Sequence, residues 1–197
     1  MFKDPRPCKY RPWVLIATLL LLMISLQMAA AGILNADPSE QKRKEMAELV
    51  IGEDPVGKPL KDFSGVTVDG QNVSSTDMRG KVLLIDLWGV NCGSCLDEMK
   101  ALEGIYHDFR DLGLVVWAVN TEQHDGEEIR GGLQLKQMSI SYTLLVDPEL
   151  EITRIFTSWF IPVTVIVDRK GIVQYYKIGF SDSDSAEVRG ILGELLK

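Results

Sequence analysis

The stretch KVLLIDL at residues 81–87 limits the possible folds more than any other segment, because after its first residue only Asp86 is polar. A continuous apolar run of this length predicts a strand that is buried on both faces, as in the middle of a sheet. Beyond residues 88–91, apolar side chains recur every three or four positions up to Phe109, and Gly113 follows. This spacing predicts an amphipathic helix that ends at the glycine.

Strand and helix patterns alternate through the rest of the sequence. Residues 65–75 alternate around Asp69-Gly70, a pair that indicates a hairpin turn. The other expected elements are strands at 114–119, 142–146, 163–167 and 173–178, and helices at 126–138, 148–156 and 185–196. Alternating strands and helices that end in an antiparallel hairpin predict an α/β domain, with a mixed central sheet flanked by helices.

Residues 13–34 are almost entirely apolar, and a helix needs about 20 such residues to span the hydrocarbon core of a membrane. Basic residues precede this run, so we expect its start in the cytoplasm and its end outside. Two interpretations stay open for residues 12–36: an uncleaved transmembrane anchor, or a signal peptide with Ala29 and Ala31 as its cleavage signal. Both interpretations place the remainder of the chain outside the cytoplasm.

Four segments follow from this pattern. They are a basic cytoplasmic segment at 1–11, the anchor or signal peptide at 12–36, a linker or short helix at 37–55, and a globular domain at 56–197. The first segment carries +3, the second has no charge, and the whole chain carries −7, which leaves −10 on the residues from Asp37 onward. Such an acidic domain would repel phosphate groups, so nucleic acid is not expected as a partner.

Cysteine use is sparse, with Cys8, Cys92 and Cys95 only. Three cysteines are too few for a disulfide scaffold, and Cys8 lies on the cytoplasmic side or is removed. The spacing of the other two, C-x-x-C, predicts either a redox pair or half of a metal site. A structural zinc site needs four ligands, and the two histidines follow no finger-like spacing. We therefore expect no metal and no cofactor, and favour the redox pair over inert thiols.

The motif CGSC is placed where the buried strand leads into the helix, and this position favours thiol chemistry. Thiol exchange needs a thiolate, whereas a free thiol titrates near ~8.5. The first turn of a helix presents unpaired N–H groups and the positive end of the helix dipole, which stabilise an anion there. Cys92 is expected to be the more exposed thiol and to attack, and Cys95 to lie deeper and resolve the mixed disulfide.

Several stretches together resemble the thioredoxin-like superfamily, and within it the exported, often membrane-tethered TlpA-like or ResA-like group. The stretches are RGKVLLIDLWGVNCGSC, AVN after the second buried strand, LLVD with a helix behind it, and FIPVTVIVDRKG. The resemblance covers residues 59–197. It implies a thioredoxin-like fold with an extra helix–strand–helix insertion at 121–156, and a thiol–disulfide oxidoreductase with Cys92–Cys95 as its redox-active disulfide.

The resemblance also implies roles for single residues. Pro162 falls at the cis-proline of the family, which faces the disulfide, and Ile161 before it would offer backbone groups to a bound substrate strand. An ordinary trans proline at the edge of a sheet is the alternative. Trp88 matches the aromatic residue of the family in the turn between strand and motif. The resemblance therefore implies that Trp88 takes part in substrate binding. Glu98 matches an acid near the disulfide, although a helix surface needs polar residues in any case.

Asp86 matches the buried acid of thioredoxin. A carboxyl group inside an apolar strand should have a raised pKa and could take the proton from Cys95 during exchange. The alternative is an aspartate that only points to solvent. The sequence departs from thioredoxin at Asn91, where a tryptophan is usual, and at Ser94, where a proline is usual. The redox potential and the pKa of Cys92 therefore do not follow from the resemblance.

The function expected from this sequence is the reduction of disulfides in other exported proteins. Apocytochrome c is the candidate substrate that the resemblance suggests, and a membrane electron donor would be needed to re-reduce the pair. The expected place is the bacterial cytoplasmic membrane with the domain facing the periplasm, or the periplasm itself after cleavage. The alternatives are a disulfide oxidant or isomerase, a peroxiredoxin-like peroxidase, and a copper-delivery module, for which this chain has no histidine near Pro162.

Overall fold

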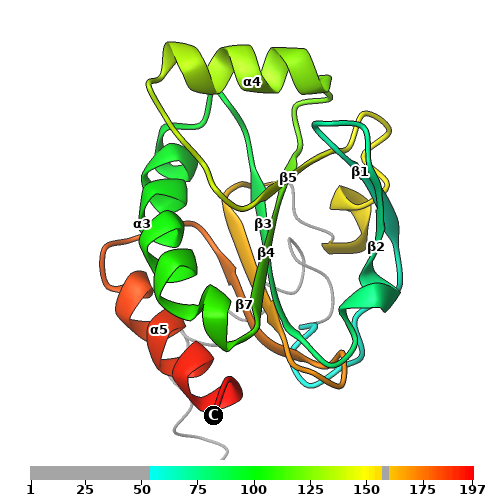
Figure 1. Cartoon of the computed structure of the whole chain (residues 1–197), viewed down its shortest axis with the longest axis vertical. Helices are drawn as coiled ribbons and strands as arrows, with labels where there is room; N and C mark the ends of the chain where they lie inside the picture. Colours follow the sequence, from blue (N-terminus) through cyan, green and yellow to red (C-terminus); the bar gives the residue numbers. More distant parts are fainter. Residues whose placement is uncertain (1–53, 157–159) are drawn as a thin grey trace, which may run out of the picture. The chain divides into compact units, whose positions relative to one another are not determined.

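A computed structural model describes residues 54–156 and 160–197 of the chain (Figure 1). These residues form a seven-stranded mixed sheet in the order β2-β1-β5-β4-β3-β6-β7. The strands are β1 (Ser64–Thr67), β2 (Asn72–Ser74), β3 (Val82–Trp88), β4 (Leu114–Asn120), β5 (Thr143–Val146), β6 (Val163–Val167) and β7 (Val173–Ile178). The helices are η1 (Ser75–Met78), α3 (Gly93–Phe109), η2 (Arg110–Leu112), α4 (Gly126–Leu135), η3 (Thr153–Phe156) and α5 (Asp184–Leu195). The predicted α/β fold with a mixed sheet is confirmed.

Strand β3 lies inside the sheet, parallel to β4 and antiparallel to β6, and all of its residues are buried. Alternate side chains point to opposite faces of a strand. Val82, Leu84 and Trp88 pack in one apolar cluster with residues of α3, α4 and α5. Leu83, Ile85 and Leu87 pack in a second cluster, which includes Phe156 of η3. Burial on both faces explains why this strand has no alternation of polar and apolar residues.

Most of the predicted elements are present. The hairpin of β1 and β2 is antiparallel and turns at Gly70, and β6 and β7 form the second hairpin. Helix α3 begins right after Cys92, and Gly113 beyond η2 has a φ of 101°. A glycine tolerates this left-handed backbone, which fits its predicted role as the end of the helical segment.

Two helices are shorter than predicted. The helix expected at 126–138 ends at Leu135. The helix expected at 148–156 is only η3, which begins at Thr153. The cause lies in Asp147, whose carboxylate accepts hydrogen bonds from the backbone N–H groups of Ile152 and Thr153 at 3.2 and 2.8 Å. These bonds hold residues 147–152 in a turn, where an aspartate side chain competes with helical hydrogen bonding.

The segment expected to be an anchor or signal peptide, residues 12–36, lies outside the described residues, as does nearly all of the linker at 37–55. Within residues 54–156 and 160–197, none of the helices has the length and apolar character needed to cross a membrane.

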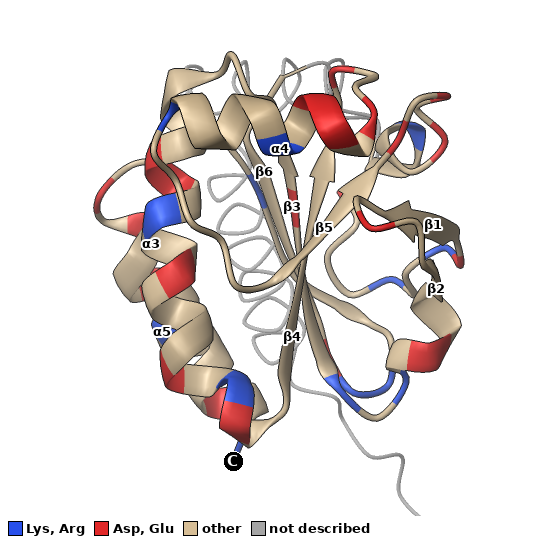
Figure 2. Cartoon of the chain, turned by 45° about the horizontal axis from the view of Figure 1, so that its top comes forward, with Lys and Arg blue, Asp and Glu red and all other residues tan. Residues whose placement is uncertain are grey.

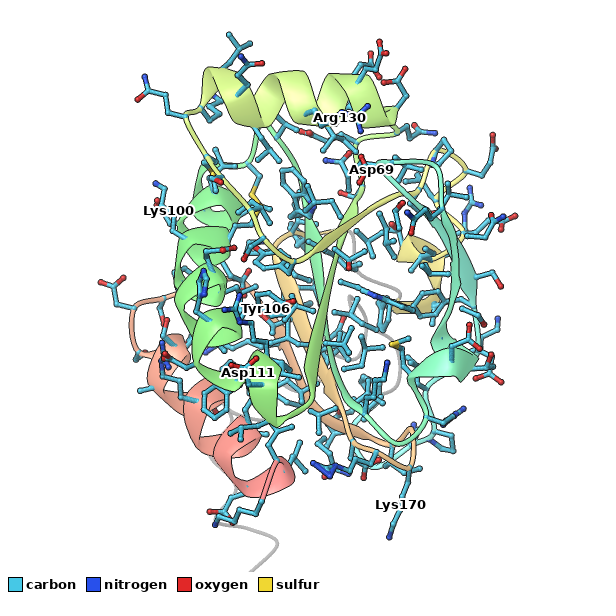
Figure 3. The ribbon with its side chains drawn as sticks, in the orientation of Figure 1. Asp69, Lys100, Tyr106, Asp111, Arg130 and Lys170 are labelled. Atoms are coloured by element: carbon cyan, nitrogen blue, oxygen red, sulfur yellow. A yellow bond between two sulfur atoms is a disulfide. The ribbon has the colours of Figure 1, made fainter. Side chains whose placement is uncertain are left out.

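Helix α4 is fastened across one end of the sheet next to the β1–β2 hairpin (Figure 1). Its first turn is held by a capping box, in which Asp125 accepts from the backbone of Glu128 and the Glu128 side chain accepts from the backbone of Asp125. Arg130 of α4 donates to the carbonyl oxygen of Val68 at 2.7 Å and to Asp69 at 3.2 Å, and Figure 3 shows the latter pair side by side. These bonds hold the start of α4 against the β1–β2 turn.

Candidate active site

Cys92 and Cys95 form a disulfide at the point where β3 leads into α3, with their Cα atoms 5.2 Å apart. Cys92 is the N-cap residue of α3, and its Sγ atom accepts a hydrogen bond from the backbone N–H of Cys95 at 3.2 Å. The hydroxyl oxygen of Ser94 lies 3.5 Å from the same sulfur. In the reduced protein, these groups and the positive end of the helix dipole would stabilise a thiolate on Cys92.

The two sulfur-bearing residues differ in their exposure. Cys92 is half-buried, whereas Cys95 is completely buried in the cluster that underlies α3. An incoming thiol or disulfide can therefore reach Cys92 before it reaches Cys95. This arrangement is compatible with the expected roles of attacking and resolving cysteine, which stay predictions.

The segment before β6 faces the disulfide. The peptide bond between Ile161 and Pro162 is cis, and the carbonyl oxygen of Ile161 lies 4.0 Å from the Sγ atom of Cys92. Pro162 is buried, Ile161 is half-buried, and Phe160 before them is 58% exposed. The cis geometry expected at Pro162 is thus present. Binding of substrate by Ile161 and Pro162 stays a prediction.

Asp86 lies in the middle of β3 and is 0% exposed. Neither of its carboxylate oxygens has a hydrogen-bond partner in the described part of the chain. Burial raises the pKa of Asp86 well above its usual range, and the nearby negative charge of Glu98 raises it further. The interpretation of Asp86 as an aspartate that points to solvent is therefore wrong.

Glu98 follows Cys95 by one helical turn and is only 3% exposed, so it is not one of the polar residues on the surface of α3. The hydroxyl group of Thr164 on β6 donates a hydrogen bond to its Oε1 atom, and Oε2 has no partner in the described residues. Burial raises the pKa of Glu98 to about 7, with Thr164 and Lys177 lowering it and Asp184 raising it. The two buried carboxyl groups lie on the α3 side of the sheet, and a negative charge on Glu98 makes it harder to ionise Asp86.

Trp88 does not lie in the turn before the motif, where the sequence placed it. It is the last residue of β3, it is 0% exposed, and it belongs to the same apolar cluster as Cys95. Its indole N–H has no hydrogen-bond partner in the described residues. Contact between Trp88 and a substrate stays untested, and in the disulfide form its whole surface is in contact with the core.

Sequence reasoning missed Glu122, which lies after β4 and holds the loop before the motif. Its carboxylate accepts hydrogen bonds from the backbone N–H groups of Val90 at 2.5 Å and Asn91 at 3.1 Å. A Cβ atom on Gly89 would lie 2.8 Å from the Glu122 carboxyl carbon, so the carboxylate packs directly on this loop. Only its position after AVN could have drawn attention to Glu122, because a contact between two loops leaves no periodic pattern.

The C-x-x-C spacing is also found in half of a metal site. In the parts of the chain that the structure describes, no group of three or more His, Cys, Asp or Glu side chains is arranged to hold a metal ion.

The fold and the disulfide together define a thioredoxin-like domain of the thiol–disulfide oxidoreductase class, with the reactive pair at the start of a helix and a cis-proline opposite. A model of the AhpC/TSA family matches residues 56–176, which is more than half of the chain. The protein belongs to this family.

Known proteins with similar sequences and structures agree with this class. Protein DipZ of Mycobacterium tuberculosis is 25% identical over 85% of this chain, although the chain spans only 25% of DipZ. Thiol-disulfide oxidoreductase ResA of Halalkalibacterium halodurans is 21% identical, over 87% of this chain and 89% of ResA. A crystal structure of a putative thiol:disulfide interchange protein DsbE from Chlorobium tepidum has a TM-score of 0.66 and 24% identity, covering 72% of this chain and 98% of the other. The last similarity shows the fold alone.

Proposed function

We propose that this protein reduces disulfides in other exported proteins through the Cys92–Cys95 couple. The observation that supports this direction most directly is the pair of buried acids, Asp86 and Glu98, on the face of the sheet that α3 covers. Cys95 is buried on the same face, and a carboxylate there disfavours a thiolate on Cys95, which keeps that thiol protonated and makes the pair a better reductant. Strong oxidants, by contrast, depend on a stabilised thiolate, and Gly93 and Ser94 contribute no charge for that purpose.

The reaction has two exchange steps. The Cys92 thiolate attacks a substrate disulfide, so that a Cys92–substrate disulfide forms and one substrate sulfur leaves as a thiolate. Cys95 then loses its proton to a nearby carboxylate and attacks the Sγ atom of Cys92. The mixed disulfide breaks, the second substrate sulfur leaves and takes up a proton, and Cys92–Cys95 is oxidised while the substrate is reduced. A membrane electron donor would return two electrons and two protons.

Substrate binding would use the edge formed by Ile161 and Pro162. The Ile161 carbonyl oxygen lies beside the Cys92 sulfur and is available to an extended polypeptide. Because main-chain groups do not distinguish side chains, this contact suits many protein substrates. Apocytochrome c is one such substrate, an expectation that rests on the resemblance to ResA-like proteins. The apolar residues 13–34 would hold the domain at the outer side of the membrane.

Equilibration of the purified domain with glutathione buffers tests the direction of electron flow. A reductant should have a midpoint potential well below the protein disulfide isomerase value of about −180 mV. A midpoint well above that value would make the protein an oxidant or isomerase. Absence of any exchange with a model peptide disulfide would contradict the oxidoreductase function as a whole.

A further inference from the structure

A row of polar residues crosses three neighbouring strands on the face that α3 covers. The register pairs Asp86 of β3 with Thr164 of β6, and Thr164 with Lys177 of β7. Residues that face each other on adjacent strands point to the same side of a sheet. Strand β7 is the last strand of the sheet, so the row begins at an edge and ends at the central strand. The edge strand is thus connected to the interior acid by one intervening hydroxyl-bearing residue.

Helices α3 and α5 each add an acidic residue to this row. Glu98 of α3 accepts the hydrogen bond of the Thr164 hydroxyl group, and Lys177 forms an ion pair with Asp184 at the start of α5. The backbone N–H of Ser181 donates to the other Asp184 oxygen at 2.7 Å. Charged or hydrogen-bonding groups therefore follow one another from β7 to β3, with a contact or a register pair at each step.

Exposure falls steadily along the row. The Lys177 side chain is 36% exposed and that of Asp184 is 7% exposed. Glu98 and Thr164 are each 3% exposed, and Asp86 is 0% exposed. Lys177 is therefore the member of the row that meets solvent, while the acids nearest the disulfide have no direct access to water.

The charges that act on the two buried acids come from α3, α5 and β7. Lys177 is the cation that lowers the pKa of Glu98, whereas Asp184 and burial raise it. Two tyrosines also face this region. Their pKa values are raised, by burial first, and they hold their protons at neutral pH. These tyrosines are Tyr142, on which the charge of Glu103 acts, and Tyr175, on which the charge of Glu187 acts. Within this set, Lys177 is the group that favours a negative charge on Glu98.

We propose that Lys177 is a positioning residue for the resolving step: its charge keeps the Asp86–Glu98 pair from holding two protons, so that the pair can accept the proton of Cys95. This inference rests on the proposed function. It adds a residue on the far hairpin, 82 positions after Cys95 in the sequence, to the machinery of exchange.

The proton balance of the step is simple. Cys95 gives one proton to the carboxylate pair as its sulfur attacks Cys92. The pair later gives one proton to water. If the pair already holds two protons, it cannot accept a third, and attack by Cys95 has to wait for the loss of one. The rate of the resolving step should therefore rise with pH, with a midpoint that reports the ionisation of the pair.

Stopped-flow oxidation of the reduced protein by a model peptide disulfide measures this midpoint, because the resolving phase does not depend on peptide concentration. Lys177→Gln removes the charge and keeps a hydrogen-bond donor for Asp184, so the midpoint should move up by about one pH unit. At neutral pH the resolving phase would then slow by up to about tenfold. Lys177→Arg should keep the wild-type midpoint, as should Lys170→Met, in which an exposed lysine of the β6–β7 turn is replaced.

Asp184→Asn gives a test of opposite sign. Its negative charge raises the pKa of Glu98, so its removal should move the midpoint down. Mere damage to the structure would slow both variants without opposite shifts, and Asp184→Asn decides the matter if Lys177→Gln does not fold. Equal midpoints in all variants, or shifts in one direction only, would overturn the role of Lys177. Failure of the wild-type protein to exchange at all would instead overturn the proposed function.

Discussion

Cys92 and Cys95 occupy the same turn of α3 but have different surroundings, since only Cys92 is reached from outside. In the reduced protein, we expect Cys92 to be alkylated first, because the helix N-terminus lowers the pKa of its thiol. Cys95→Ser should accumulate a mixed disulfide with substrate, because the resolving thiol is missing. Mass spectrometry of iodoacetamide-treated protein measures the order of reaction. Faster labelling of Cys95 would reverse the assigned roles.

Asp86 has no hydrogen-bond partner in the described residues, so its charged form is costly in the core. Asp86→Asn should slow disulfide exchange by roughly 10²-fold or more, as expected when a general base is removed. The free energy of unfolding should stay the same or increase, since no charge has to be buried. Chemical denaturation and exchange kinetics at neutral pH measure the two effects. Wild-type kinetics in Asp86→Asn would reduce this residue to a structural one.

Glu98 should make the stability of the oxidised protein depend on pH. Its pKa is about 7 in the folded state against 4.5 for the free side chain. The folded state therefore binds the proton more tightly, which stabilises it fully below pH 4.5, and this contribution is lost as the pH rises to about 7. The loss is roughly 3 kcal/mol for such a shift. Urea titrations across this range should show it.

The matched comparison for Glu98 is a glutamate on the surface. Glu98→Gln should make the decrease in stability between pH 4.5 and pH 7 smaller, and the part that remains comes from Asp86, whose pKa is also raised by burial. Glu149→Gln, at an exposed turn, should keep it. If both variants retain the wild-type pH dependence, another group causes it.

At the scale of elements, α4 supports the loop that precedes the motif. A Cβ atom on Gly132 would lie 2.5 Å from a methyl carbon of Val90, and Glu122 holds the same loop through its backbone. The pair Gly131-Gly132 weakens the sequence-based prediction of this helix, because glycine is a poor helix former. The structure gives a reason for one of the two: Gly132 lets the helix approach Val90, a contact between distant segments that no local pattern reveals.

This contact predicts opposite effects for neighbouring glycines. Gly132→Ala should destabilise the protein by about 1–3 kcal/mol, because the added methyl group overpacks against Val90. It should also slow exchange by displacing the loop before Cys92. Gly131→Ala meets nothing within 4 Å and should be neutral or stabilise the helix by up to about 1 kcal/mol. Thermal unfolding of both variants measures the difference; equal melting temperatures would argue against the close approach.

The elements themselves could largely be predicted from the sequence, for reasons that differ between them. Strand β3 can be predicted from its continuous apolar run, and helix α3 from apolar residues that recur every three or four positions. The hairpin at Gly70 can be predicted from its turn residues. The helix predicted at 148–156 was too long, because Asp147 binds the backbone ahead of it. In the site, the cysteines, Asp86 and Pro162 could be found, whereas Thr164 and Lys177 depend on strand register, which only the assembled sheet defines.

At the scale of the whole molecule, charge and the N-terminal apolar run bear on where the domain works. Acidic residues lie along α3, α4 and α5 in Figure 2, in keeping with the negative charge of the domain. We predict that residues 13–34 are retained as an anchor. Mass spectrometry of the protein from native membranes should find an uncleaved N-terminus, and high salt should not release the protein. A mature chain that begins at Gly32 or Asp37 would make it a soluble exported protein.

Cys95 is buried behind a half-buried Cys92, and this restricts the stage of folding at which the disulfide of a substrate protein can be reached. A disulfide enclosed in a finished client domain cannot approach a sulfur that is itself recessed beside Ile161. A disulfide in a substrate chain that is still unfolded can approach this sulfur. If the protein reduces disulfides as proposed, reduction would compete with the folding rate of the substrate protein, and slow-folding substrates would be open to it for longer. The timing of client maturation, rather than a recognition sequence, would then decide which disulfides are opened.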